Sequence, residues 1–91
     1  MIRYALRKDV VFRKEADGAL LYDHATGRVI PLNGTAAFMC ESLFVEGKEQ
    51  DEVLTGIKTR WKVADEKRVK SDLEKLVAGM KMRDLIEEVT S

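Results

Sequence analysis

The segment Arg28–Ala37 constrains the fold of this chain most strongly, because it combines a proline with an apolar run that leads directly into a helix signal. Pro31 cannot donate to a strand ladder, so it belongs at a sheet edge or at a strand end. Asn33 is a good helix N-cap, and apolar residues recur at helical spacing after it. The segment therefore predicts an edge strand over residues 28–32, followed at once by a helix. The side chains that suit a pleated strand are Val29, Ile30 and Leu32.

Two hairpin signals precede this strand. Residues 10–15 and 19–23 are rich in apolar and branched side chains, and the Asp17-Gly18 pair between them is typical of a tight turn. Residues 24–27 form a second turn, in which Gly27 can take a positive φ. The three strands are expected to form an antiparallel meander, with residues 28–32 at one edge.

The rest of the chain has helical spacing of its apolar residues. We expect helices over residues 34–46 and 51–61. A third helix is expected to begin after the N-cap Asp65 and to end near Arg83. Three strands followed by three helices predict an α+β domain of winged-helix type.

The two ends of the chain and one glycine carry weaker signals. Residues 1–9 are expected to be loose or partly strand, Leu85 and Ile86 to pack back on the core, and residues 87–91 to fray. Gly79 lies inside the third helix, where glycine costs about 1 kcal/mol relative to alanine. It either ends the helix early or lets another backbone come close.

Length and composition predict a single small domain, residues 1–91. The 16 Lys and Arg balance the 16 Asp and Glu, whereas a nucleic-acid binder usually has a basic excess. The sequence contains no apolar run long enough for a signal peptide or a membrane span. We therefore expect a cytosolic protein with no membrane partner.

The sequence offers no set of residues suited to catalysis or to metal binding. The one cysteine, Cys40, excludes an intramolecular disulfide and is expected to be a buried small hydrophobe. His24 is expected to be a solvated turn residue, because no second type of metal ligand lies near it in the sequence. We therefore expect a protein that is not an enzyme and that carries no cofactor.

Three short motifs follow one another along the chain. They are Leu20-Leu21-Tyr22-Asp23, then Val29 with Leu32-Asn33-x-Thr35-Ala36, then Asp72-Leu73-x-x-Leu76-Val77-x-x-Met80-x-x-x-Asp84-Leu85-Ile86. In this order and spacing they resemble the coenzyme PQQ synthesis protein D family, over about residues 10–86. The chain departs from the family pattern in three places, which are Asp23-His24 in place of Pro-Glu, Leu76-Val77 in place of Phe-Leu, and Asp84 in place of Gly.

The resemblance implies a peptide-recognition element of a ribosomal peptide modification system. In that family, a three-stranded sheet with three helices binds the leader segment of a precursor peptide as an added strand. The bound peptide is presented to a modifying enzyme, often a radical S-adenosylmethionine enzyme. Carried onto this chain, the groove lies between strand 28–32 and helix 66–83. The implied peptide-binding residues are Arg28, Val29, Ile30, Pro31 and Leu32 on the strand, and Val69, Asp72, Leu73, Leu76 and Val77 on the helix.

Backbone pairing alone cannot hold a peptide in such a groove. A hydrogen bond contributes about 1 kcal/mol net, whereas micromolar affinity needs roughly 8 kcal/mol before ordering costs. Apolar side chains of the peptide must therefore enter pockets. We expect Val69, Leu76 and Val77 to supply free apolar surface, while Leu73 and Met80 belong to the core. The alternative is that all five residues are plain core.

The charged residues near the implied groove and its proline also have more than one interpretation each. Arg28, Lys70 and Lys75 either contact acidic residues of the leader or are simply solvated. Pro31 either removes a donor from the open edge or turns its nitrogen toward the neighbouring strand, and it can also serve only to protect the edge against aggregation.

Two other functions fit the same sequence. A DNA-binding winged-helix transcriptional regulator would place the third helix in the major groove, with Lys67, Arg68, Lys70 and Lys75 as contacts. The acidic residues on the same helix argue against this function. A structural subunit would instead add its edge strand to a partner protein or to its own copy, as a homodimer. Binding to duplex DNA with a steep salt dependence would identify the transcriptional regulator, and self-association would identify the structural subunit.

Overall fold

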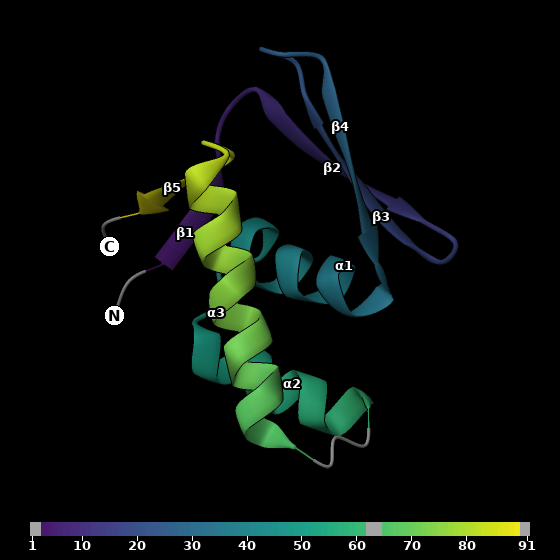
Figure 1. Ribbon diagram of the computed structural model, residues 1–91, viewed down its shortest axis with the longest axis vertical. Coiled ribbons are helices and arrows are strands. Elements are labelled where there is room, and N and C mark those ends of the chain that lie inside the picture. Colours follow the sequence, from purple (N-terminus) through teal and green to yellow (C-terminus); the bar gives the residue numbers. More distant parts are fainter. Residues whose placement is uncertain (1–2, 62–64, 90–91) are drawn as a thin grey trace.

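The computed structural model describes residues 3–61 and 65–89. A three-stranded antiparallel meander lies against the helices, and a two-stranded sheet lies on the other side of the last helix (Figure 1). The strands are β1 (Arg3–Leu6), β2 (Val10–Glu15), β3 (Gly18–Asp23), β4 (Arg28–Asn33) and β5 (Ile86–Val89). The helical segments are α1 (Gly34–Cys40), η1 (Glu41–Val45), α2 (Gln50–Arg60) and α3 (Glu66–Met82). The predicted α+β architecture is confirmed, with a terminal strand pair added to it.

The meander has the predicted order β2–β3–β4, so β4 is an edge strand. Glu15 pairs with Gly18 across a two-residue turn, and Gly18 therefore belongs to β3 rather than to the turn. A Cβ at Gly18 would collide with the carbonyl oxygen of Leu32 on β4, so only glycine lets the two strands approach at this point. Gly27 takes a positive φ of 76° in the second turn, as predicted.

The helix that follows β4 begins where the sequence predicts it but changes pitch along its length. The side chain of Asn33 accepts a hydrogen bond of 2.9 Å from the backbone N–H of Ala36, which satisfies a free donor of the first turn. After Cys40 the helix widens into the π-helical segment η1, where the N–H of Glu46 donates to the carbonyl of Glu41 at 2.9 Å. The predicted helix over residues 34–46 is therefore right in extent and wrong in regularity.

The two ends of the chain pair with each other. β1 and β5 form an antiparallel pair in which Arg3 lies opposite Val89 and Leu6 opposite Ile86. The prediction that residues 87–91 fray is therefore wrong for residues 87–89, while residues 90–91 lie outside the described residues. The error has a physical reason, because the pairing joins segments from opposite ends of the chain and no local pattern reports it.

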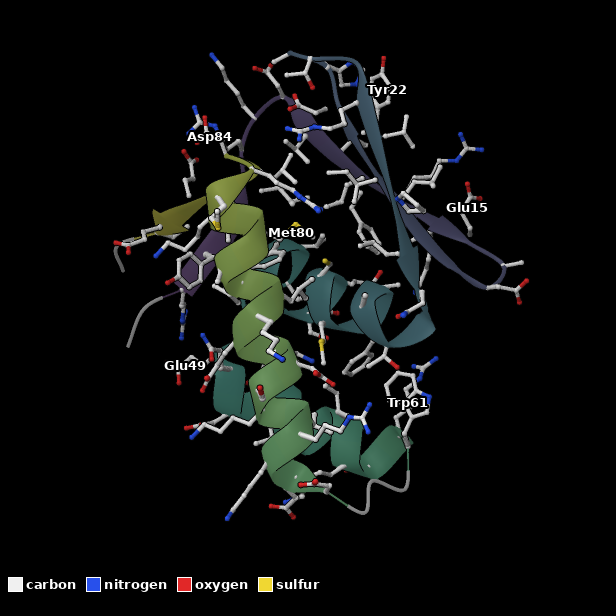
Figure 2. All side chains as sticks on the ribbon, viewed as in Figure 1. Glu15, Tyr22, Glu49, Trp61, Met80 and Asp84 are labelled. Atoms are coloured by element: carbon white, nitrogen blue, oxygen red, sulfur yellow. The ribbon has the colours of Figure 1, made fainter. Side chains whose placement is uncertain are left out.

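Buried side chains from both sheets and from all the helices form one core. Leu73 and Met80 belong to it, as predicted, and Figure 2 shows Met80 on the side of α3 that faces the meander. Cys40 is also buried, and desolvation raises the pKa of its thiol to about 12. The thiol is therefore protonated at neutral pH, which agrees with the interpretation of Cys40 as a small hydrophobe rather than a nucleophile.

The end of α3 is closed by a residue in the left-handed region. Asp84 has a φ of 60°, and the N–H of Leu85 beyond it donates to the carbonyl of Met80 at 3.0 Å. This backbone geometry commonly has glycine at the position of Asp84. The side chain of Asp84 also lies 3.4 Å from the guanidinium of Arg7, but both groups are exposed.

We expect Asp84→Gly to raise the free energy of unfolding by about 0.5–1 kcal/mol. The substitution relieves the left-handed backbone and removes an anion from the negative end of a helix. The substitution also removes the ion pair with Arg7, but an exposed ion pair contributes little to the free energy of unfolding. Urea denaturation measures the change, and Asp84→Asn, which removes only the charge, should fall between the two proteins. A loss of stability in Asp84→Gly would mean that the ion pair dominates.

Candidate functional site

The outer edge of β4 is open in the part of the chain that the structure describes. β4 pairs with β3 on one side only, and the amino-terminal strand β1 pairs with β5 instead of adding to the meander. Unpaired N–H and C=O groups along an edge strand are a template for another strand. The edge strand predicted from Pro31 is therefore present and accessible to a guest chain.

The two edges of the meander differ in charge. β2, at the other edge, ends in the charged run Arg13-Lys14-Glu15, and charged side chains on an edge strand discourage further pairing. β4 carries one charged residue, Arg28, at its start. Charge therefore protects the β2 edge more than it protects the β4 edge.

The predicted site residues of β4 divide between two faces of the sheet. Ile30 is half-buried and Leu32 is buried, and both point toward the core with Arg28 on the same face. Val29 and Pro31 alternate with them and are exposed on the outer face. A guest strand beside β4 would extend both faces in the same alternation.

Two contacts establish which flank of α3 faces β4. The ammonium of Lys81 lies 5.6 Å from the ring centroid of Tyr4 on β1, while the guanidinium of Arg28 donates to the carbonyl of Arg83 at 3.4 Å. The β1–β5 pair and the meander accordingly lie on opposite sides of the last turns of α3 (Figure 1). At 100° per residue, Leu76 and Gly79 lie on the flank of α3 opposite Lys81, which is the flank turned away from β1 and toward the meander (Figure 1).

The helix residues predicted for the site have different surroundings. Val69 and Leu76 are half-buried and pack against the edge of the core, Asp72 is exposed, and Leu73 is fully buried. Val77 is 6% exposed, so the expectation that it supplies free apolar surface is wrong. Val77 lies one turn before Lys81, on the flank that faces β1. The sequence left open a partial strand within residues 1–9 but gave no sign of its position beside α3, so the burial of Val77 was not predicted.

One of the two sequence interpretations of Gly79 is wrong, and the other stays a prediction. Helix α3 continues past it to Met82, so it does not end the helix. No described atom outside its own stretch of the helix lies within 4 Å of the position that a Cβ would occupy, so it does not serve close packing within the described chain. A half-buried glycine on the β4 flank is thus left without an internal role.

A hollow of about 320 Å³ lies beside the other edge of the meander, where β2 meets α1 and the end of α2. Phe38 and Trp61 stand edge to face in it, with ring centroids 5.3 Å apart. The guanidinium of Arg60 lies over both rings, at 5.5 Å from Phe38 and 5.2 Å from Trp61. Sequence analysis did not predict this hollow, because its residues come from distant segments. It provides a reporter for the β2 edge, since Trp61 is the one tryptophan of the chain.

A smaller hollow of about 160 Å³ lies where the start of β4 meets the end of α3. Arg7, Arg28 and Arg83 line it together with Asp84 and two further aspartates. The positive and negative side chains in its wall are therefore equal in number. The contact of Arg28 with acidic leader residues stays a prediction.

In the described segments, no three His, Cys, Asp or Glu residues lie close enough together to hold a metal ion. His24 lies in a turn with its ring 4.5 Å from that of Tyr22. No helix within residues 3–61 and 65–89 is both long and apolar enough to cross a membrane.

The basic residues of α3 do not gather on one face. Lys70 and Lys75 are exposed, and their spacing of five residues puts them about 140° apart around the helix axis. Exposed Asp72 and Glu74 lie between them in the sequence. A recognition helix for DNA needs a continuous basic surface, so this arrangement does not favour the regulator hypothesis.

Two solved structures are similar to this chain over nearly its whole length. "TbiB1 in Complex with the TbiA(beta) Leader Peptide" matches with a TM-score of 0.82 and 23% identity, and the match covers 96% of this chain and 99% of that chain. "Lasso peptide synthetase B1 complexed with the leader peptide" matches with a TM-score of 0.82 and 21% identity, covering 93% and 98%. At these identities the similarity establishes the fold. No curated protein sequence matches the chain.

The sequence pattern of one protein family covers most of the chain. The family is described as coenzyme PQQ synthesis protein D, and the match extends over residues 18–86. This range includes β3, β4, all the helices and the first residue of β5. The resemblance predicted from the three motifs is thereby confirmed, and the chain belongs to the coenzyme PQQ synthesis protein D family.

Proposed function

We propose that this protein binds the leader segment of a ribosomally made precursor peptide, as an added strand along β4 and beside the Leu76 flank of α3. It acts without catalysis, in the cytosol, and presents the peptide to a modifying enzyme such as a radical S-adenosylmethionine enzyme. The observation that carries the proposal is the open, weakly charged edge of β4. Strand addition at such an edge is a general mode of peptide recognition.

The comparisons support this function. Both similar structures are complexes with a leader peptide, as their names state, and this chain has the same fold over almost its full length. Membership of the coenzyme PQQ synthesis protein D family agrees with a role in peptide maturation. The proposed position of the groove is supported by the open edge of β4 and by the place of Leu76 on the flank of α3 turned away from β1.

Apolar anchors on the peptide supply most of the affinity. Ile30 on β4 and Val69 and Leu76 on α3 are half-buried at the border of the core, so a guest side chain can cover the apolar surface that they leave exposed. Burial contributes roughly 25 cal/mol for each Å² of apolar surface. The backbone hydrogen bonds then set the register and direction of the peptide rather than its affinity.

The edge of β2 is the competing site for strand addition, and the tryptophan distinguishes the two edges. The neighbouring reading frames are inspected for a short precursor peptide, and a synthetic peptide with its leader sequence is titrated into the protein, with calorimetry and tryptophan emission recorded together. We expect saturable binding with unchanged emission, because Trp61 lies in the hollow beside β2. An emission shift at saturation would assign the peptide to the β2 edge. Absence of binding would contradict the proposed function.

Gly79→Ala should stabilise the protein and weaken peptide binding. Replacing a glycine in a helix interior raises the free energy of unfolding by about 1 kcal/mol, and the new methyl group meets no described atom of the free protein. On the β4 flank, however, it reduces the space for a guest backbone. We expect at least a fivefold rise in Kd, measured by calorimetry, together with a higher denaturation midpoint.

The matched control for Gly79→Ala is the reverse exchange at the preceding residue. Ala78 is exposed in the same helix, a third of a turn away from the β4 flank. Ala78→Gly should lose about 1 kcal/mol of stability and leave peptide affinity unchanged. If Gly79→Ala binds as tightly as the natural protein, the guest strand does not pass over this turn of α3.

A further inference from the structure

We propose that the outer face of the meander is the surface that docks the peptide-modifying enzyme, and that this enzyme contacts the sheet and the bound peptide together. The inference rests on the proposed function and adds the partner surface to it. The outer face is the one turned away from the core, and it consists of the alternate residues of β2, β3 and β4.

An exposed apolar row crosses all three strands of this face. Val11 pairs with Tyr22, and Tyr22 pairs with Val29. Val11 is 46% exposed, Tyr22 38% and Val29 50%. In the next row the half-buried Leu20 pairs with the exposed Pro31. Side chains directly opposite one another on a sheet face are in contact, so these five residues form one continuous patch.

Charge is nearly absent from the face. An antiparallel sheet with one solvated face ordinarily alternates apolar residues inward with polar residues outward. Here the charged residues on the outer face are Arg13 and Glu15, which pair with each other on β2 at 3.8 Å. In a chain with 35% charged residues, an outer face of this kind is typical of a surface that meets another molecule.

The size of the apolar patch and its lack of charge indicate what kind of molecule binds it. A stable interface buries roughly 800 Å² on each partner, and five partly exposed side chains cover much less, so the occupant needs further contacts, which an enzyme acting on the bound peptide gains from the peptide itself. An anionic membrane attracts clusters of Lys and Arg beside an apolar surface, and this face carries one arginine that is already paired. A protein with an apolar, uncharged surface fits the face.

The bound leader extends this surface. Alternate side chains of a strand added to β4 would emerge on the same face as Val29 and Pro31. The patch is therefore wider with the peptide bound than without it. An enzyme that contacts the wider patch would bind the peptide-bound protein more tightly than the free protein. An enzyme that acts on the peptide requires this selectivity.

The neighbouring reading frames are inspected for a peptide-modifying enzyme, and that enzyme is purified and immobilised for the test, with the leader peptide present or absent. Val11→Ser combined with Tyr22→Ser removes two of the five patch residues, one on β2 and one on β3, away from the peptide edge. We expect at least a tenfold loss of enzyme affinity, unchanged calorimetric affinity for the peptide, and tighter enzyme binding by the natural protein when the peptide is present. The matched control replaces the exposed Val45 and Met82, which lie outside the face, with serine.

Each result decides the inference separately from the proposed function. Unchanged enzyme affinity in the double variant, or an equal loss in the control variant, would overturn the docking surface. Sedimentation equilibrium that shows a dimer in the natural protein and a monomer in the double variant would also overturn it, in favour of a second copy. If the double variant does not fold, each single substitution is expected to give a smaller loss in the same direction. Failure of the natural protein to bind the peptide contradicts the proposed function instead.

Discussion

Leu76→Asp is expected to abolish peptide binding while the protein keeps its fold. Leu76 is half-buried on the flank of α3 that faces β4, so a carboxylate at this position still reaches water in the free protein. A guest strand would cover it and leave an unpaired charge in an apolar groove, at a cost of about 3 kcal/mol or more. This cost corresponds to a rise in Kd of at least about 100-fold. Calorimetry measures the affinity, and far-UV circular dichroism reports the fold.

The control introduces an aspartate at a second position of α3, outside the proposed groove. Met82 is highly exposed near the end of α3, and Met82→Asp should bind the leader peptide as the natural protein does. If Leu76→Asp unfolds instead, Leu76 is an ordinary core residue, which is the alternative that the sequence left open. If it folds and binds normally, the peptide does not lie between β4 and α3.

Tyr4→Ala should cause the largest loss of stability among the variants considered, about 3 kcal/mol. The side chain of Tyr4 on β1 is buried, and its ring lies beneath the ammonium of Lys81 on the last turn of α3. Truncation leaves a cavity and exposes the flank of α3 that carries Val77. Urea denaturation measures the loss. Peptide affinity of the folded protein should stay the same, because β4 lies on the opposite flank of α3.

The control for Tyr4→Ala is the same truncation at the exposed tyrosine. Tyr22 lies on the outer face of the sheet and away from the core, near the end of the meander labelled in Figure 2. Tyr22→Ala should cost less than about 1 kcal/mol. A cost below 1 kcal/mol for Tyr4→Ala as well would mean that the β1–β5 pair contributes little to the folded core, and that the amino-terminal segment is free to move toward the meander.

Local signals predicted the central part of the fold. Pro31 predicted the edge strand, Asn33 predicted the start of the first helix, and Asp65 predicted the start of the last one, where it accepts from the N–H of Arg68 at 3.2 Å. Each of these residues acts on backbone groups within a few positions of itself. Their effect can therefore be predicted without knowledge of the tertiary structure.

Non-local contacts account for what the sequence did not predict. The β1–β5 pair joins residues near opposite ends of the chain, and its presence explains why Val77 is buried while Leu76, its neighbour, remains partly open. The apolar row from Val11 to Val29 needs the register of two strand pairs. Helical spacing predicted which side chains of α3 are apolar, but not which flank another element covers.

Amide chemical-shift mapping tests the strand-addition proposal most directly, because it reports each backbone group separately. With the leader peptide bound, we expect large shifts and slowed hydrogen exchange for amides of residues 28–33, and shifts for residues 69–80 of α3. Amides of β2 and of the β1–β5 pair should remain close to their positions in the free protein. Shifts confined to residues 10–15, or spread over the β1–β5 pair with β4 unchanged, would contradict the account.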